Sequence, residues 1–368
     1  MVAFYAGLAK SEPAQQPIHQ PDISFRHEVE HAIDKGAQWL QSSQNSNGWW
    51  STSDQPAVTA LALSALMGEP NGQLRTHPTE GVDHGYKFII DHAKPDGSIY
   101  EKGLANYNTS ICMMGLLAAQ DARYDSVLRK ARQWVISQQV DGGGVGYGDR
   151  GNRSDMNNTF TALEALYYSR NLAPKPDSTL TADAKDLNWA GAIKFIQSCQ
   201  NLPASNKLSW VSSDPKDEGG FVYYPGRSNA GSVTNADGRV ALRSYGSISY
   251  AGLLSYIYAD LKPDDPRVTA VFDWLRTNYT VDENPGMGAA GLYYYLHLMT
   301  KALAVYGVDQ LPVKGQTVDW RRDVAMKLIN LQKADGSWAN ENGRWWEHDP
   351  ALVTSYSVMS LEILYRGL

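Results

Sequence analysis

The chain has 368 residues, a net charge of −6 and 43% hydrophobic residues. Its acidic and basic residues are interspersed, which argues against a basic nucleic-acid groove and against a polybasic membrane patch. No apolar run approaches the ~18 residues of a membrane-spanning helix, so we expect a soluble body. The 21 Tyr and 11 Trp, against 7 Phe, join apolar rings to polar tips and favour a deep pocket or the wall of a ring-shaped protein.

Two parts of the chain are expected. Residues 1–24 are weakly apolar at first and then rich in Gln and Pro, which predicts a flexible segment. This composition is typical of a linker after a trimmed export signal and favours an exported or periplasmic location. Residues 25–368 are expected to form a single domain. Cys112 and Cys199 lie in helical patterns without metal-ligand spacing, so we expect both to be buried and free.

A short motif, Gln-x-x-x-Gly-x-Trp, occurs at residues 44–50 and again at 332–338. Each copy follows an amphipathic helical pattern and leads into a more apolar one. Such self-similarity at the two ends of a chain is typical of a repeat architecture.

The helical patterns before these loops place an aromatic and an aliphatic residue one turn after a small residue. They lie at 36–40, 85–89, 131–135, 192–196 and 270–275. A sixth pattern, Asp323–Leu331, has Lys327 at the aromatic position. Polar residues between the apolar ones predict amphipathic helices, which we assign to an outer ring.

The helical patterns after the loops share Thr-x5-small-Leu. Copies begin at Thr59, Thr109, Thr159 and Thr354, with degenerate copies at Gly246 and Leu296. Since these helices are apolar or small nearly all round, we expect them to be buried as an inner ring. Six such pairs predict an all-α fold, an (α/α)6 toroid, because an open stack would leave its terminal inner faces in water. All inner helices then point their N termini at one mouth.

The fourth repeat is longer than the others. From the outer aromatic residue to the inner reference position takes 20 residues in the first repeat (39 to 59) but 51 in the fourth (195 to 246). The excess predicts a loop insertion at 200–243 over the mouth. Long loops in compact domains are more often functional than decorative.

Residues 28–366 resemble the prenyltransferase and squalene-cyclase repeat family, whose hallmark is the Gln-x-x-x-Gly-x-Trp motif, with degenerate versions here at 93–97 and 139–143. That family includes terpenoid cyclases, zinc prenyltransferases and proteins of unassigned role. The resemblance implies a terpene-cyclase-like or prenyltransferase-like enzyme that holds an isoprenoid or other apolar substrate in a central aromatic-lined cavity. It is more specific for the fold than for the reaction.

Residues 155–159, Asp-Met-Asn-Asn-Thr, resemble the Asp-x-Asp-Asp-Thr motif of the cyclase branch. In that branch the middle aspartate protonates an alkene or epoxide. Asn157 stands at this position, and an amide cannot donate the catalytic proton. Asp155 remains, as a residue that orients rather than protonates, so the resemblance is to a divergent member without the family acid.

In the zinc prenyltransferases an Asp-x-Cys pair precedes an Ala-Gly-Leu-Leu helix, which is similar to residues 251–254. This alignment puts Arg243 and Tyr245 at the pair, and Tyr295 where the family has a histidine ligand. Arginine and tyrosine do not form a tetrahedral zinc site. We therefore predict no catalytic metal and no cofactor.

The insertion supplies the leading site candidates. Arg239 and Arg243, near the converging helix N termini, could grip a diphosphate, carboxylate or sulfate, or else form an ion pair that anchors the loop. Asp237 is the replacement acid if desolvation raises its pKa, although Arg239 favours its charged form. The predicted catalytic residues are therefore Asp237, Asp155 and Tyr245.

Further substrate-binding candidates lie at the helix starts. Asn157, Asn158 and Tyr107 begin two inner helices, where the amides either cap the helix or bind a polar head group. If Tyr294 or Tyr245 lines the cavity, its ring would stabilise a carbocation, whereas aromatic residues at helical spacing otherwise pack in a core.

Two histidines and a tryptophan complete this set. His297 and His348 titrate near neutrality. Trp345 and His348 precede the last inner helix, where they could bind a ring-shaped or sugar ligand at the mouth. Asp349 before Pro350 is also an ordinary helix cap.

Two alternative functions remain open. One is a non-catalytic toroid that binds a lipid, a glycan or a protein at the mouth, since both the family acid and the zinc ligands are missing. The other is a carbohydrate-active α/α-toroid enzyme with paired carboxylates, Asp237 with Asp155 or Glu347. The expected partner is an apolar small molecule rather than a nucleic acid, and an apolar rim could also make peripheral contact with a membrane.

Overall fold

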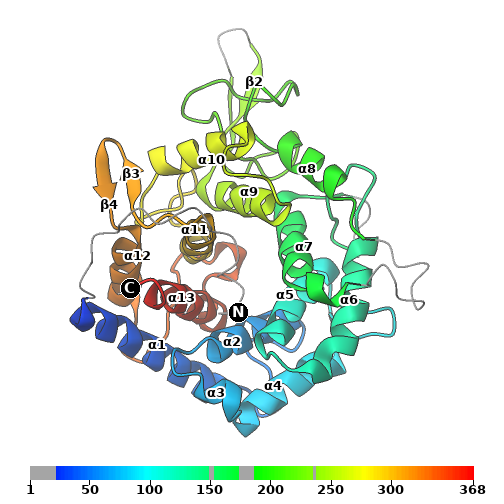
Figure 1. Ribbon diagram of the computed structural model, residues 1–368, viewed down its shortest axis with the longest axis vertical. Coiled ribbons are helices and arrows are strands. Elements are labelled where there is room, and N and C mark those ends of the chain that lie inside the picture. The colour runs from blue at the N-terminus through cyan, green and yellow to red at the C-terminus, as the bar shows by residue number, and fades with distance from the viewer. Residues whose placement is uncertain (1–21, 149–152, 174–185, 235–237) are drawn as a thin grey trace.

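A computed structural model of the chain describes residues 22–148, 153–173, 186–234 and 238–368. Two concentric rings of helices dominate it, which confirms the predicted all-α toroid (Figure 1). The expected N-terminal segment falls almost wholly outside the described residues, and so does Asp237.

The outer ring is made of amphipathic helices that turn one face inward. They are α1 (Ile23–Ser43), α4 (Glu80–Asp91), α6 (Asp125–Ser137), α8 (Trp189–Ser198), α10 (Pro266–Thr277) and α12 (Trp320–Leu331). In α4, Phe88 and Ile89 are buried while Lys87 between Tyr86 and Phe88 is exposed. The side chain before each of α1, α4, α8, α10 and α12 accepts a hydrogen bond from a first-turn N–H, so these helix starts are fixed by local sequence.

The inner ring is buried on nearly all sides. Its helices are α2 (Pro56–Met67), α5 (Ala105–Ala118), α7 (Met156–Tyr168), α9 (Gly246–Tyr258), α11 (Leu292–Tyr306) and α13 (Pro350–Tyr365). Each inner helix contacts the next one along the chain, and α13 contacts α2 (Figure 1). The ring is therefore closed. Cys112 and Cys199 are buried and free, as expected.

The glutamine of the repeated motif joins neighbouring repeats. Gln44 Nε2 donates to the carbonyl of its own loop glycine and to Gly81 O at the start of α4, at 2.9 and 2.7 Å. Gln332 Nε2 donates in the same way to its own loop glycine and to Ala32 O in α1, at 3.0 and 2.9 Å. The last repeat is thus bonded to the first, and the motif serves ring closure.

The threonines of the inner helices also have a structural role. Thr59 Oγ1 and Thr354 Oγ1 each accept from the backbone N–H of the motif tryptophan, at 3.2 and 3.0 Å. In the fourth repeat Ser249 Oγ accepts the equivalent bond from Phe221 N, at 2.9 Å. The sequence-based choice of Gly246 for this position was therefore wrong by three residues, about one helical turn, because small residues recur along α9 at that spacing.

The insertion of the fourth repeat lies inside the motif itself. Gln200 Nε2 donates to Gly219 O at 3.0 Å, the bond that the other motif glutamines make to a glycine four residues away. Residues 201–218 therefore lie between the motif glutamine and the motif glycine, where the other copies have three residues. The hairpin of β1 (Ser232–Thr234) and β2 (Val240–Leu242) follows, and it projects away from the ring rather than over its mouth (Figure 1).

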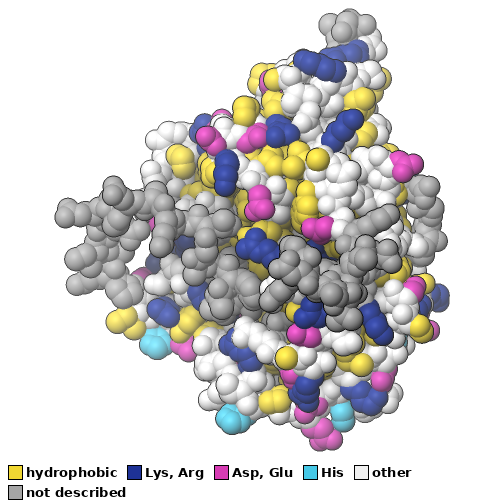
Figure 2. Space-filling view, turned by 45° about the vertical axis from the view of Figure 1, so that its right-hand side comes forward, with side chains coloured by type: hydrophobic (Ala, Val, Ile, Leu, Met, Phe, Trp, Pro, Cys, Tyr) yellow, Lys and Arg dark blue, Asp and Glu magenta, His cyan; other side chains and the backbone are white. Residues whose placement is uncertain are grey.

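The remaining elements are short. Helix α3 (Gln73–Thr76) follows α2, and an antiparallel hairpin of β3 (Leu311–Val313) and β4 (Gln316–Val318) connects α11 with α12. On the face drawn in Figure 2, acidic and basic side chains are interspersed. None of the helices in the described residues is long and apolar enough to cross a membrane.

Candidate functional site

A cavity of about 340 Å³ opens at the N-terminal ends of the inner helices, and we call it the mouth chamber. All six inner helices contribute residues of their first two turns to it, so their N termini converge as predicted. Aromatic side chains form a large part of its walls. Among the described residues they include Tyr107, Tyr147, Tyr223, Tyr245, Tyr294, Tyr356, Trp345 and Trp346.

Four of these tyrosines form two hydroxyl pairs. The hydroxyl oxygens of Tyr147 and Tyr223 lie 2.7 Å apart, and those of Tyr107 and Tyr356 lie 3.3 Å apart. Burial raises the pKa of each of these phenols. They are neutral at physiological pH, so the wall offers ring faces and hydroxyl groups rather than charge.

The mouth chamber has a floor of three tyrosines, Tyr107, Tyr294 and Tyr356, which we call the tyrosine floor. The same residues line a second cavity of about 60 Å³ towards the C-terminal ends of the inner helices. We call this second cavity the base chamber. The rings of Tyr294 and Tyr356 lie 5.7 Å apart between centroids. The tyrosine floor therefore separates the bore into two compartments.

Asn157 lines the mouth chamber beside the tyrosine floor. Its Oδ1 accepts a hydrogen bond of 2.6 Å from the hydroxyl of Tyr294. Asn158 also lines the chamber, and its amide is held on both sides, donating to Asp155 Oδ2 at 3.0 Å and accepting from Asn106 Nδ2 at 3.2 Å. Asn157 is thus the more available of the two amides for a ligand.

Glu347 is the one carboxyl group among the described residues that line the mouth chamber. It is 1% exposed. Its Oε1 accepts from Tyr294 N and its Oε2 from Asn340 Nδ2, each at 2.7 Å. Desolvation raises the pKa of Glu347 above its ordinary value of 4.5, while these hydrogen bonds to the carboxylate act in the opposite direction.

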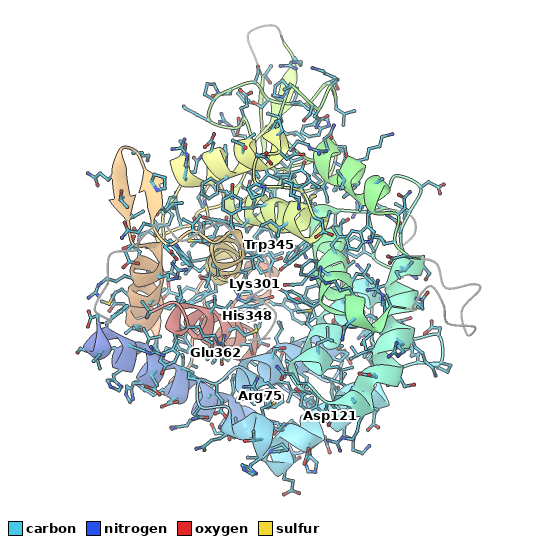
Figure 3. The ribbon with its side chains drawn as sticks, viewed as in Figure 1. Arg75, Asp121, Lys301, Trp345, His348 and Glu362 are labelled. Carbon is cyan, nitrogen blue, oxygen red and sulfur yellow. The ribbon has the colours of Figure 1, made fainter. Side chains whose placement is uncertain are left out.

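Two tryptophans form the rim of the mouth chamber. Trp345 and Trp346 are 44% and 45% exposed, and their φ angles of 57° and 66° lie in the left-handed region. That backbone costs about 1–2 kcal/mol per non-glycine residue, so the loop holds the pair at some expense. The Trp345 ring packs on Gly291, where a Cβ would lie 2.9 Å from it. Seen down the ring, Trp345 lies over the central opening (Figure 3).

No family model matches this chain, and no curated protein matches it significantly by sequence. Solved structures do match. The type II terpene cyclase MstE from Scytonema, without ligand, has a TM-score of 0.56 and 14% identity over 93% of this chain and 99% of its own. An MstE variant in complex with its substrate geranylgeranyl dihydroxybenzoate has a TM-score of 0.57 and 13% identity over 94% and 100%. The fold is that of the type II terpene cyclases.

The terpene-cyclase fold extends to carbohydrate-active proteins. An inactive variant of an α-1,6-mannanase from Salegentibacter, in complex with α-1,6-mannotriose, matches with a TM-score of 0.55 and 13% identity over 91% of this chain and 99% of its own. Identities of this size show a shared fold. The ligand has to be argued from the site of this chain.

Among the described residues of the predicted loop cluster, one lines the mouth chamber. Tyr245 lines the mouth chamber, and its hydroxyl accepts from Asn229 Nδ2 at 3.2 Å. Arg243 instead forms an ion pair of 3.7 Å with the buried Asp217. Arg239 is exposed beside β2 on the hairpin that projects away from the ring, and Asp237 lies outside the described residues. Neither arginine lines the mouth chamber.

Asp155 is fully buried and does not line the mouth chamber. It is the N-cap of α7, where its Oδ1 accepts from Asn158 N at 2.9 Å. A carboxylate that caps a helix in this way is held by first-turn donors. Together with burial, the charge of Asp155 raises the pKa of Tyr147 and Tyr223, two of the tyrosines that line the chamber.

The two predicted histidines lie elsewhere. His297 lines the base chamber, where its ring stacks on Tyr356 at 5.2 Å. Desolvation, together with the charge of Lys301, lowers the pKa of His297 well below its ordinary value of 6.5. His348 is exposed, 3.4 Å from Gly343 O, and does not line the mouth chamber. Neither histidine lines the mouth chamber.

Some lining residues were not among the sequence candidates. They are Tyr147, Tyr223, Tyr356, Trp346 and Asn229. The excess of tyrosine over phenylalanine was the one signal for aromatic lining residues, and a composition does not show where in the chain such residues lie. Among the residues that the structure describes, no group of three or more His, Cys, Asp or Glu is placed to hold a metal ion.

Proposed function

We propose that the mouth chamber binds an isoprenoid-type substrate, with its hydrocarbon part against the tyrosine and tryptophan rings and its polar end at the rim. The observation that carries this proposal is the aromatic-walled cavity of about 340 Å³ in the bore. Ligand pockets commonly measure roughly 300–1,000 Å³. The MstE variant of the same fold is seen with a geranylgeranyl-bearing substrate, which supports the choice of ligand class.

The chemistry proposed is an alkene protonation of the terpene-cyclase kind, with Glu347 as the proton-transfer group. Burial favours the protonated carboxyl before reaction. Its proton would pass to an alkene carbon, leaving a carbocation on the substrate and a carboxylate on Glu347. The donors Tyr294 N and Asn340 Nδ2 would then stabilise that carboxylate. Loss of a proton from the final carbocation to Glu347 would restore the acid.

The tyrosine rings suit the second half of this reaction. A carbocation is stabilised over the face of an aromatic ring, by about 2 kcal/mol or more where water is excluded. Tyr245 is 2% exposed and Tyr356 is 6% exposed, so their ring faces are dry. The amide of Asn157 would contribute a dipole rather than a proton.

One observation favours a second candidate, glycan binding. The exposed pair Trp345 and Trp346 offers flat rings at an entrance, and the matched mannanase is seen with a bound mannotriose. Glycoside hydrolysis requires two carboxyl groups across the bond. Since the described residues of the mouth chamber supply one, Glu347, this candidate is binding without hydrolysis.

The proposed function is tested by titrating the protein with geranylgeraniol and with mannotriose while following tryptophan fluorescence. We expect saturable binding of geranylgeraniol and none of mannotriose, and we expect Trp345→Ala to weaken it roughly tenfold. Trp189→Ala in α8, which lines neither chamber, is the matched control. Saturable binding of mannotriose alone, or equal affinity in both variants, would refute the proposal.

A further inference from the structure

The base chamber lies on the far side of the tyrosine floor and takes no part in the function proposed above. Its volume is about 60 Å³, and a cavity that holds one water molecule measures roughly 10–15 Å³. It therefore has room for a small organic molecule. Its apolar wall includes three methionines, Met67, Met114 and Met359, whose flexible side chains adapt to irregular ligands.

One ion pair of the base chamber is already satisfied. Lys301 Nζ contacts Glu164 Oε1, and the hydroxyl of Tyr258 donates to the same oxygen at 3.0 Å. Both side chains of the pair are at most 10% exposed. The charges of Lys301 and Glu164 thus cancel within the wall, so this pair gives the chamber no net charge.

Glu362 is different because one oxygen of its carboxyl group lacks a donor. It lines the base chamber at 3% exposure, and its Oε1 has no hydrogen-bond partner among the residues that the structure describes. The carboxyl group occupies the place that a Cβ on Gly68 would fill, so this glycine makes room for it. A buried polar atom without a partner is rare because it has lost its hydration without compensation, which points to a missing donor.

His297 also lines the base chamber. The hydroxyl of Ser360 donates to Tyr356 O at 2.7 Å, so its oxygen must accept from His297 Nδ1, 3.2 Å away. The proton of this neutral imidazole is therefore on Nδ1, and Nε2 keeps a bare lone pair. The unsatisfied Oε1 of Glu362 calls for a ligand that donates a hydrogen bond.

We propose that the base chamber is a binding site for a small organic amine, whose ammonium group pairs with Glu362 and whose alkyl part packs on the methionine wall. An ammonium supplies three donors, one of which would satisfy Glu362 Oε1. Arg366 at the rim is partly committed, because its Nη2 donates to Gly68 O at 2.5 Å. Arg75 also lies at the rim, so an anionic ligand is the outcome that the test has to separate.

The test is a calorimetric titration of the whole protein with n-butylamine, 1-butanol and butyrate, which share an apolar chain and differ in head-group charge. We expect saturable binding of n-butylamine at about 1 mM or tighter, and none of the other two. Glu362→Gln should weaken n-butylamine binding at least about tenfold, because it removes one partner of a buried charge pair. Glu341→Gln, an exposed acid outside the chamber, should leave it unchanged.

A second variant is needed to distinguish the loss of the Glu362 charge from a change of fold in Glu362→Gln. Met359→Phe fills the chamber without altering its charge, so it should also abolish n-butylamine binding. Binding of geranylgeraniol in the mouth chamber is expected to stay unchanged in Glu362→Gln, which keeps the two proposals separate. Binding of butyrate or 1-butanol as tight as that of n-butylamine would overturn the amine proposal. So would the absence of n-butylamine binding, or an affinity unaffected by both variants.

Discussion

The hydroxyl of Tyr294 donates a 2.6 Å hydrogen bond to Asn157 Oδ1, from α11 across the bore to α7. This bond ties the tyrosine floor to the position at which the resembled cyclase motif carries its acid. It explains how an amide is accommodated there, since a neutral carbonyl oxygen accepts from a phenol without a change in charge. The proton donor proposed for the mouth chamber is therefore a residue other than Asn157.

Removing this bond should cost stability. Tyr294→Phe leaves Asn157 Oδ1 without its donor, so we expect the free energy of unfolding to fall by about 1–2 kcal/mol. Urea denaturation followed by circular dichroism measures this change. Tyr365→Phe, a partly exposed tyrosine at the end of α13, is the control and should change the free energy by less than about 0.5 kcal/mol. Equal effects in both variants would show that the bond contributes nothing.

Ring closure should depend on the last motif glutamine. Gln332→Ala removes one hydrogen bond that joins the final loop to α1 and one within that loop, so we expect a loss of about 1–3 kcal/mol in the free energy of unfolding. Gln41→Ala, which removes a single bond within α1, should cost less than half as much. Thermal and urea unfolding of both variants tests this. A smaller loss in Gln332→Ala than in Gln41→Ala would contradict the closure role.

The fold followed from the sequence because its signals are local and repeated. The Gln-x-x-x-Gly-x-Trp motif and the inner-helix threonines make the same backbone hydrogen bonds wherever they recur, as Thr59 and Thr354 do. One register was wrong, at Gly246, because small residues one turn apart in α9 fit the same pattern. Only the bond from Phe221 N to Ser249 Oγ separates the two registers, and it joins residues 28 positions apart in the sequence.

The site was predicted from the sequence less well than the fold, because distances between loops are set by tertiary packing. Arg239, Arg243 and Tyr245 are close in sequence, yet a β-hairpin carries the first away from the ring and Asp217 holds the second. The base chamber left no trace in the sequence pattern at all. Glu164, Lys301 and Glu362 lie on helices that are apolar nearly all round, and only their packing shows that the first two pair and the third does not.

The buried ion pair of Lys301 and Glu164 allows the cost of an unpaired buried charge to be measured. Lys301→Met leaves Glu164 charged and buried, so we expect a loss of about 3–5 kcal/mol in the free energy of unfolding. Adding Glu164→Gln to Lys301→Met removes the orphaned charge and keeps an acceptor for Tyr258, so most of that loss should be recovered. A double-mutant cycle in urea measures both values. Additive losses would mean that the two charges do not interact.

Glu362 should give the protein a distinct dependence on pH. Burial raises the pKa of Glu362 well above its ordinary value of 4.5, so the folded protein holds this proton more tightly than the unfolded chain does. Its stabilising contribution is present below pH 4.5 and is lost as the pH rises towards the folded-state pKa. Glu362→Gln imitates the protonated carboxyl. We therefore expect this variant to be more stable than the native protein at pH 8, by about 1 kcal/mol or more, with little difference at pH 4.

Denaturation at a series of pH values measures this difference directly. The native protein and Glu362→Gln should have converging midpoints at low pH and diverging ones above neutrality. Glu341→Gln, an exposed acid, should follow the native protein throughout. A variant that is less stable than the native protein at pH 8 would show that the carboxylate is paired in solution.

Substitution of Glu347 should affect catalysis and leave substrate binding nearly unchanged. Glu347→Gln keeps an oxygen for Tyr294 N, so α11 should still begin in the same place and geranylgeraniol affinity should change by less than about threefold. Loss of the acidic proton should lower product formation by about 10²–10⁴-fold, the usual contribution of a general acid. Mass spectrometry of isoprenoid alcohols and diphosphates after incubation checks this. Undiminished product formation in Glu347→Gln would remove Glu347 from the mechanism.

The most direct measurement is a crystal structure of the protein with geranylgeraniol at saturating concentration. The proposed function predicts continuous density for the hydrocarbon chain in the mouth chamber, above the tyrosine floor and against Tyr245 and Trp345, with its hydroxyl end at the rim. A mouth chamber filled only with water at that concentration, or a chain bound outside the bore, would contradict it.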